Sequence, residues 1–287
     1  MLAYLNGNYL PRDEARISPM DRGFLFGDGA YEVIPVYSRR PFRLEQHLAR
    51  LERTLAALEL ANPLTREQWA GVVEQLVASH GSEDLGVYLQ VTRGTAQVRD
   101  QAFPVPPVAP TVFAYADRLP TPSAELLEQG AAVMTAEDFR WLRCDLKTVS
   151  LVANVLLRQA SVPAGCAETL LLRNGYVMEG SASNILVVQD GTLLAPPKSH
   201  LMLPGVTYDV VLELAQANGI AVAQRPVSEA ELRSADEVWI TSSTKEVLPV
   251  TRIDDAPVAD GRPGPLARRM IALYRDFKNQ VMRRADA

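Results

Sequence analysis

Lysine is scarce in this chain, which restricts where lysine chemistry can take place. Of the 29 basic residues only four are lysines: Lys147, Lys198, Lys245 and Lys278. Lys147 lies in the segment FRWLRCDLKTVS, directly before an apolar stretch, and a lysine with a desolvated, neutral amine can form a Schiff base. The other three lie in polar or proline-containing stretches, so elimination favours Lys147. A surface lysine with a buried stem is the alternative at this position.

A carboxylate follows a predicted hairpin in the segment YVMEGSASN, where Glu179 precedes a run of small residues. If a pyridine cofactor is present, a carboxylate at the ring nitrogen keeps that nitrogen protonated and strengthens the ring as an electron acceptor. Gly180, Ser181 and Ser183 are small enough to let a ring approach closely. Without a cofactor, Glu179 would be an ordinary solvated residue at the end of a strand.

Two segments in the second half of the chain have the features of phosphate-binding sites. Residues 204–207 (PGVT) precede a predicted helix, where free N–H groups and the helix dipole favour an anion. Residues 241–244 (TSST) place four hydroxyls in a row at the end of a predicted strand. Arg50, on the flank of a leucine-rich helix, could clamp a phosphate. An N-cap at Thr207, an ordinary loop at 241–244 and a surface charge at Arg50 are the alternatives.

A long loop in the first half carries candidate groups for binding a carboxylate. Residues 94–110 (GTAQVRDQAFPVPPVAP) are too rich in proline for regular structure, and a long ordered loop is often functional. Arg99 could bind a substrate carboxylate with its planar fork, or could simply pair with Asp100. Tyr31, which follows Gly-Asp-Gly-Ala, could present its hydroxyl to a site or lie in the core.

Hydrophobic patterns predict a small N-terminal α+β domain over residues 1–117. The segment 43–60 places five leucines on one face of a helix, and Thr65-x-x-Gln68 is a capping box that begins a second helix. Strands are expected in four segments: 4–10, 29–37, 86–93 and 111–116.

A proline-containing linker over 118–124 is expected to lead into a larger C-terminal α+β domain over 125–287, which would carry Lys147. This domain is expected to contain a strand at 131–135, a helix at 148–160, a hairpin with its turn at Asn174-Gly175, and a helix that ends at Gly219.

The composition is typical of a cytoplasmic globular protein. The chain has 287 residues, 47% of them hydrophobic and 22% charged, and a net charge of −5, which argues against nucleic acid as a partner. No apolar run approaches the roughly 18 residues of a membrane span, and the N-terminus lacks a signal-peptide pattern. Two cysteines and three histidines leave little room for a disulfide scaffold or a metal site.

Five segments occur together in the order of a known family: DRGFLFGDGAYEVIPVY, RWLRCDLKTVSLVANVL, VMEGSASNILVV, LPGVTYDVV and TSSTKEVLPV. In these segments the chain resembles the fold-type IV pyridoxal-phosphate enzymes, and among them most closely the D-amino-acid aminotransferases. The resemblance runs from the first predicted strand to the last helix. It implies a two-lobed α+β fold with the active site between the lobes, pyridoxal 5′-phosphate as cofactor, and a homodimer with a shared active site.

The resemblance also implies a role for each candidate residue. Lys147 would form the Schiff base with the cofactor and move the proton between substrate Cα and cofactor C4′. Glu179 would pair with the pyridine nitrogen, and Leu203 would pack beside the ring. The cofactor phosphate would be held by Arg50, Val206, Thr207 and Ser243. The substrate carboxylate would be bound by Tyr31, Arg99 and Gln101, with Arg99 coming from the partner subunit.

One position departs from the family pattern. D-amino-acid aminotransferases commonly carry Arg-x-His in the carboxylate-binding loop, whereas here Arg99 and Asp100 are followed by Gln101. A glutamine can donate a hydrogen bond but cannot become cationic, so the substrate preference is expected to differ, especially toward dicarboxylates.

The activity implied by the resemblance is transamination between a D-amino acid such as D-alanine and a 2-oxo acid such as 2-oxoglutarate. Two other activities use the same scaffold, those of a branched-chain L-amino-acid aminotransferase and an aminodeoxychorismate lyase. A non-catalytic binding protein of this fold is a further alternative, although binding alone would not require the lysine at position 147.

Overall fold

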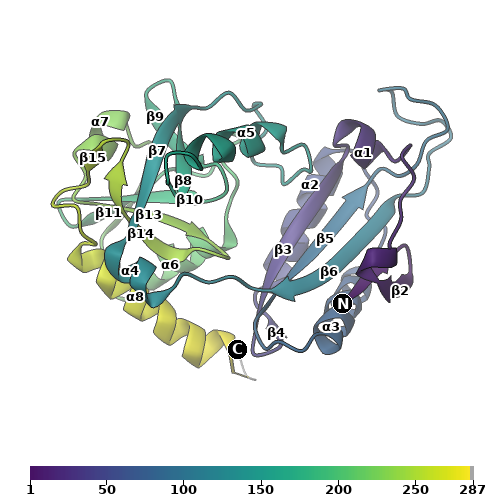
Figure 1. The fold of residues 1–287 in the computed structure, drawn as a ribbon, viewed down its shortest axis with the longest axis horizontal. Coiled ribbons are helices and arrows are strands. Elements are labelled where there is room, and N and C mark those ends of the chain that lie inside the picture. Colours follow the sequence, from purple (N-terminus) through teal and green to yellow (C-terminus); the bar gives the residue numbers. More distant parts are fainter. Residues whose placement is uncertain (285–287) are drawn as a thin grey trace. The chain divides into compact units, whose positions relative to one another are not determined.

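The computed structural model describes residues 1–284, so the last three residues of the predicted C-terminal domain, 285–287, lie outside the described residues. The chain forms two compact units (Figure 1). Unit 1 contains residues 1–119, residues 146–151 and the chain from Met282 onward, and unit 2 contains residues 120–145 and 152–281. Both units combine helices with a β-sheet, so the predicted α+β class is confirmed.

Unit 1 is built on an antiparallel sheet. Its strands are β1 (Leu2–Leu5), β2 (Asn8–Pro11), β3 (Gly29–Tyr37), β4 (Arg40–Pro41), β5 (Leu85–Thr92) and β6 (Thr111–Arg118). In residues 1–284 these six strands follow the order β2-β1-β6-β5-β3-β4. Because β5 pairs along its whole length with both β3 and β6, the centre of the sheet is its most rigidly fixed part.

Two long helices cover one face of the unit 1 sheet, α2 (Leu44–Ala57) and α3 (Arg66–Ser79) (Figure 1). The leucine spacing that predicted the first of them buries one side of α2 completely, since Leu48, Leu51 and Leu55 are each 1% exposed. The predicted capping box at the start of α3 is confirmed, because the side chains of Thr65 and Gln68 each accept from the other residue's backbone N–H.

Short elements and a long loop complete the first part of unit 1. A 3-10 turn, η1 (Arg12–Glu14), precedes the five-residue helix α1 (Arg22–Phe26), whose N-cap Asp21 accepts from the Gly23 N–H. The predicted loop at 94–110 contains neither a helix nor a strand, apart from one isolated bridge between Asp21 and Thr95.

Residues 146–151 pack with unit 1 and not with the unit that precedes and follows them in sequence. Thr148 forms an isolated bridge with Ala30, and the Val149 N–H donates to the Gly29 carbonyl at 3.0 Å. The predicted helix over 148–160 therefore begins later than expected, at Val152, because residues 148–151 pair with the start of β3 instead. For the same reason Lys147 belongs to unit 1, which differs from the predicted placement in a C-terminal domain over 125–287.

Unit 2 contains a mixed sheet. Its strands are β7 (Ala131–Glu137), β8 (Glu168–Arg173), β9 (Tyr176–Gly180), β10 (Asn184–Gln189), β11 (Thr192–Ala195), β12 (Val222–Gln224), β13 (Glu237–Ser242), β14 (Glu246–Ile253) and β15 (Ala256–Pro257). The order is β12-β11-β10-β13-β14-β7-β8-β9, with β15 paired to β14. The predicted hairpin at Asn174-Gly175 is confirmed as the turn between β8 and β9, where both residues have positive φ.

The helices of unit 2 are α4 (Ala124–Gln129), α5 (Val152–Ser161), α6 (Val206–Ala217), α7 (Glu229–Arg233) and α8 (Pro265–Phe277), the last followed by a π-helical turn at Lys278–Met282. The predicted end of α6 is confirmed, since the helix stops at Ala217 and Gly219 follows with a φ of 68°. In residues 1–284 no helix combines the length and the apolar character that crossing a membrane requires.

The packing of α2 on the unit 1 sheet predicts a large difference between two substitutions in that helix. Leu51→Ala removes a fully buried side chain and should lower the free energy of unfolding by about 2–5 kcal/mol. Arg53→Ala, two residues away on the exposed side, should change it by less than about 0.5 kcal/mol. Urea unfolding followed by circular dichroism measures both, and equal midpoints for the two variants would contradict the assigned packing.

Candidate active site

Lys147 is held beside Tyr31 by backbone hydrogen bonds. The Tyr31 N–H donates to the Lys147 carbonyl at 2.9 Å, and the Lys147 N–H donates to Thr54 Oγ1 of α2 at 3.3 Å. These bonds place the Lys147 amine over the Tyr31 ring, with Nζ 4.2 Å from the ring centroid. The sequence-predicted Lys147 and Tyr31 are therefore brought together within unit 1.

The four lysines differ in their partners. Three of them form ion pairs with carboxylates: Lys198 with Asp209 at 2.6 Å, Lys245 with Glu168 at 3.1 Å, and Lys278 with Glu246 at 2.6 Å. Among the described residues, no carboxylate forms an ion pair with the Lys147 amine, which contacts an aromatic face instead. An ion pair favours the charged amine, whereas covalent chemistry requires the neutral one, so Lys147 is the best nucleophile of the four.

Tyr31 lies on the face of the unit 1 sheet opposite to the helices. Along β3 its neighbours Ala30 and Ile34 belong to the core under α2 and α3, and alternation places Tyr31 on the other side. There it stacks on Tyr88 of β5, with ring centroids 5.6 Å apart, and Tyr88 in turn lies 5.2 Å from Tyr115 of β6. This aromatic row leaves the Tyr31 ring half-buried and supported from one side.

Arg50 is fixed by a buried acid. Its Nε and Nη2 donate to the two carboxylate oxygens of Glu32, at 2.8 and 2.5 Å, and His47 Nδ1 lies 3.2 Å from the same carboxylate. Burial works to raise the pKa of Glu32, but the contacts with Arg50 and His47 outweigh it and hold the pKa far below its usual range. Arg50 is thus an oriented, permanently charged guanidinium in unit 1, as binding of a phosphate requires.

Arg99 and Gln101 both lie exposed in the loop of unit 1, as predicted. The Arg99 guanidinium stacks on Phe26 of α1, with its central carbon 5.0 Å from the ring centroid. The alternative interpretation of Arg99, an ion pair with Asp100, does not occur, because the Asp100 carboxylate accepts from the Ala102 N–H. The planar face of Arg99 is therefore occupied by an aromatic ring.

In unit 2, Glu179 lies at the end of β9 and is buried. Arg140 Nη1 donates to its Oε1 at 2.6 Å, and the Leu203 N–H donates to Oε2 at 3.1 Å. Arg140 is itself held by Asp138 through bonds of 2.8 and 3.0 Å. The predicted solvated turn carboxylate is therefore excluded, and Glu179 and Leu203 are brought together.

The N-terminus of α6 is shaped for close approach. Asn184 Nδ2 donates to the Leu203 carbonyl at 2.9 Å, and a Cβ at Gly205 would lie 2.1 Å from Asn184 Oδ1, so only glycine fits there. Gly205 is the N-cap and makes no side-chain cap bond, which shows that Thr207 is not the N-cap but lies inside the first turn. The N–H groups of Val206 and Thr207 therefore point out of an uncapped helix end.

The hydroxyl-rich segment 241–244 turns sharply after β13. The Lys245 N–H donates to Ser242 Oγ at 3.1 Å, and this Oγ lies 3.2 Å from Thr244 Oγ1. Ser243, half-buried between them, has a side chain with no hydrogen-bond partner among the described residues. Thr241 Oγ1 is fully buried and also lacks a described partner, so unsatisfied hydroxyls are concentrated here.

These features fit a phosphorylated pyridine cofactor. The buried carboxyl of Glu179 suits a ring nitrogen, and the uncapped start of α6 and the Ser243 hydroxyl suit a phosphate. Arg50 and Lys147 of unit 1 supply an oriented guanidinium and an amine without an acid partner.

Sequence reasoning missed several residues that shape these groups. Arg140 was readable only as one of many arginines, although it lies in the same quoted segment as Lys147, seven residues earlier. Glu32 had a usable signal, because an acid at an inward position of a predicted strand must find a buried partner. Asn184 had none, since its role depends on a contact with Gly205, 21 residues later.

Comparison with known proteins agrees with this geometry. A model of the family "Amino-transferase class IV" matches residues 29–253. The chain is 38% identical to a D-alanine aminotransferase of Bacillus licheniformis over 270 residues, which is 94% of both chains. It is 36% identical to a D-alanine aminotransferase of Listeria monocytogenes over 284 residues, covering 99% of this chain and 97% of that one.

Solved structures extend the comparison to the fold. A branched-chain amino acid aminotransferase from the source abbreviated T.th., determined with pyridoxamine 5′-phosphate, superposes with a TM-score of 0.89 and 28% identity. The match covers 99% of this chain and 95% of the other. Since the family model spans Lys147, Glu179 and both phosphate-site segments, the chain belongs to the class IV aminotransferases.

Proposed function

We propose that the protein transfers the amino group of a D-amino acid such as D-alanine to a 2-oxo acid such as 2-oxoglutarate, with pyridoxal 5′-phosphate as cofactor. The observation that carries this proposal is the near full-length similarity to D-alanine aminotransferases. The amine of Lys147, which has no described acid partner, and the buried carboxyl of Glu179 supply the two groups that the chemistry needs. Composition and charge support the cytoplasm as its location.

Lys147 is the proton carrier in this mechanism. Pyridoxal phosphate, when bound, supplies an aldehyde that takes up the substrate amino group and a ring that accepts the electron pair left behind at Cα. Lys147 Nζ then removes the Cα proton and returns it at the cofactor carbon. The Tyr31 ring beneath the amine and the bond from the lysine backbone to Thr54 fix the amine's position, so the proton moves over a short, defined path.

Glu179 holds the charge that makes the ring an electron acceptor. Burial raises the pKa of the Glu179 carboxyl to about 7, and the hydrogen bonds from Arg140 and the Leu203 N–H offset only part of this effect. Placed against a ring nitrogen, the anionic carboxylate would hold a proton there. Arg140 keeps the carboxylate turned in one direction.

Binding groups at both ends of the substrate–cofactor pair follow from the remaining residues. We assign the phosphate to Arg50, Val206, Thr207 and Ser243. We assign the substrate carboxylate to Tyr31, Arg99 and Gln101. Because Arg99 and Gln101 are exposed in unit 1, they are accessible to the active site of a second copy, and we propose a homodimer with shared sites.

A branched-chain L-amino-acid aminotransferase is the second candidate. The solved T.th. structure favours it, since it carries the name of a branched-chain enzyme and has the same fold. Its identity of 28% is lower than the 38% shared with the D-alanine enzyme of Bacillus licheniformis, and we therefore prefer the D-specific activity.

The two activities predict opposite results in one assay. The purified protein with pyridoxal phosphate and 2-oxoglutarate should form glutamate from D-alanine, and at least about tenfold more slowly from L-leucine. Chiral chromatography of the glutamate adds a second readout, because the D-specific enzyme should release D-glutamate. Glutamate that forms only with L-leucine would replace the proposed activity by the second candidate.

Removal of the proposed proton carrier should abolish turnover without unfolding the protein. Lys147→Ala is expected to lower kcat by at least about 10³-fold, because no other described lysine lacks an ion pair with a carboxylate. Lys198→Ala, which removes only an exposed ion pair with Asp209, is the matched control and should retain activity. Borohydride reduction followed by peptide mapping should place the cofactor on the peptide that contains Lys147, and a label on another lysine would disprove the assignment.

The raised pKa of Glu179 predicts how the cofactor-free protein responds to pH. The carboxyl is protonated below about 7 in the folded chain but only below 4.5 in the unfolded one, so the folded state binds more protons between these values. The free energy of unfolding should therefore fall as the pH rises from about 5 to about 8, on the order of 2 kcal/mol more than in Glu179→Gln. Urea unfolding at four pH values measures this, with the exposed Glu128→Gln as control. Equal pH profiles for wild type and Glu179→Gln would contradict the assigned protonation.

A further inference from the structure

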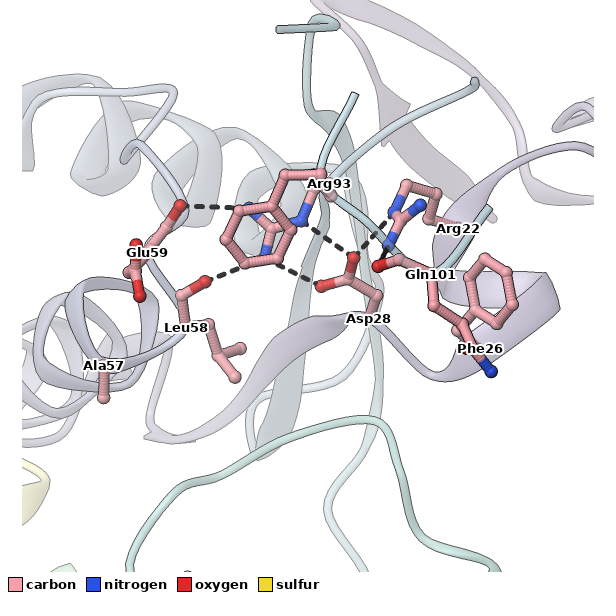
Figure 2. A pocket seen from close by; sticks show the side chains of 9 residues that line it. Arg22, Phe26, Asp28, Ala57, Leu58, Glu59, Arg93 and Gln101 are labelled. Carbon is pink, nitrogen blue, oxygen red and sulfur yellow. Dashed lines mark hydrogen bonds and ion pairs between the residues drawn. The ribbon is translucent and has the colours of Figure 1, made fainter. Parts of the chain in front are cut away.

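One carboxylate in unit 1 binds two arginines. Asp28, in the turn between α1 and β3, accepts from Arg22 Nε at 2.8 Å and from Arg93 Nε and Nη2 at 2.8 and 3.0 Å (Figure 2). The Arg22 side chain is 4% exposed, so this cluster of charges is nearly removed from water. We call Arg22, Asp28 and Arg93 the loop mount.

The charges of the loop mount do not cancel, because two guanidiniums face one carboxylate. Backbone carbonyls accept from the remaining N–H groups. Arg93 donates to the carbonyls of Leu58 and Glu59 at the end of α2, at 2.7 and 3.0 Å. Arg22 donates to three consecutive carbonyls of the loop: Asp100, Gln101 and Ala102. A buried guanidinium without acceptors is costly, so Arg22 and the loop backbone depend on each other.

Two aromatic contacts fix the loop on either side of these carbonyls. The Phe26 ring lies against the guanidiniums of both Arg22 and Arg99, whose central carbons are 4.9 and 5.0 Å from its centroid. Phe103 lies over Arg93 at 3.7 Å. The loop is thus held at Arg99, at the carbonyls 100–102 and at Phe103, and each hold involves the loop mount or a residue stacked on it.

Apolar packing does not explain the position of this loop. Gln101 and Phe103 line a cavity of about 490 Å³, together with Arg22, Asp28 and Arg93 (Figure 2). Beneath the loop there is open space instead of a packed core, so polar contacts must supply most of its order. The bonds from Arg93 and Arg22 outweigh the burial of Asp28 and hold the pKa of its carboxyl below the usual range, which keeps the cluster charged.

We propose that Arg22 is a positioning residue for substrate recognition: by fixing the backbone at 100–102 it sets where Arg99 and Gln101 meet the substrate carboxylate. This inference rests on the proposed function, in which Arg99 and Gln101 bind that carboxylate. Arg22 itself contacts neither cofactor nor substrate in this assignment. Its loss should therefore weaken binding of the amino acid and leave binding of the cofactor intact.

The direct test compares two arginines that bind backbone carbonyls. Arg22→Met keeps a side chain of similar length but removes every donor, and should raise KM for the amino acid at least about tenfold with a smaller change in kcat. Arg39→Met is the matched control, because Arg39 also donates to a row of carbonyls, at the end of α3: Val77, Ala78, His80 and Ser82. Its KM should be unchanged, and both variants should keep the absorption spectrum of the bound cofactor.

A carboxylate probe and a double mutant separate positioning from general loosening. Propionate, which has the carboxylate but not the amine of alanine, should inhibit Arg22→Met more weakly than wild type by the same factor as the rise in KM. Arg22→Met in an Arg99→Ala background should cause little additional loss, because two residues that act through one contact are not additive. Arg22→Lys, which keeps the charge but not the planar fork, should give an intermediate KM and serves if Arg22→Met does not fold.

The outcomes distinguish this inference from the proposed function. An active wild type in which Arg22→Met or Arg22→Lys has a normal KM, or losses that add fully to those of Arg99→Ala, would overturn the positioning role alone. A rise in KM of equal size in Arg39→Met would also overturn it, since the effect would then be general. A wild type with no transamination of D-alanine or L-leucine would instead remove the proposed function.

Discussion

The placement of one amine depends on a strand-like pairing that the chain makes between distant segments. Residues 146–151 leave unit 2 and pair with the start of β3, so that the Lys147 carbonyl accepts from the Tyr31 N–H and Nζ lies over the Tyr31 ring. Without this pairing the lysine would be one of four surface amines. Because β3 is fixed by β5 over its whole length, the rigidity of the unit 1 sheet is transmitted to the lysine.

A second constraint is the repeated use of a buried acid to orient an arginine. The pairs that matter for the site are Glu32 with Arg50, Asp28 with Arg22, and Glu179 with Arg140. Removing either member would leave an uncompensated buried charge, so each pair is locked by the cost of separating it. Only the planar fork of arginine can bind a carboxylate and still have donors for a second partner, and in this chain the basic residues are mostly arginine.

The sequence predicts well what local patterns determine. The leucine spacing of 43–60, the capping box at Thr65 and the Asn-Gly turn at 174 each specify their own structure, and each is confirmed. The lysine was identified by elimination and by family resemblance. The start of α5 was predicted too early, because the helical pattern over 148–151 is overridden by pairing with β3, a contact between segments more than 100 residues apart.

The same distinction separates the reaction from its specificity. Lys147 and Glu179 lie on or beside regular strands, and motifs around them are readable because strand geometry constrains their neighbours. A single lysine can act on either antipode, so handedness is decided by which side of the site takes the carboxylate. We place that decision in an irregular loop, over open space, whose position depends on the buried charges of the loop mount. Sequence similarity around the lysine therefore identifies the chemistry, whereas the choice of amino acid depends on polar contacts at 100–102 that no local pattern encodes.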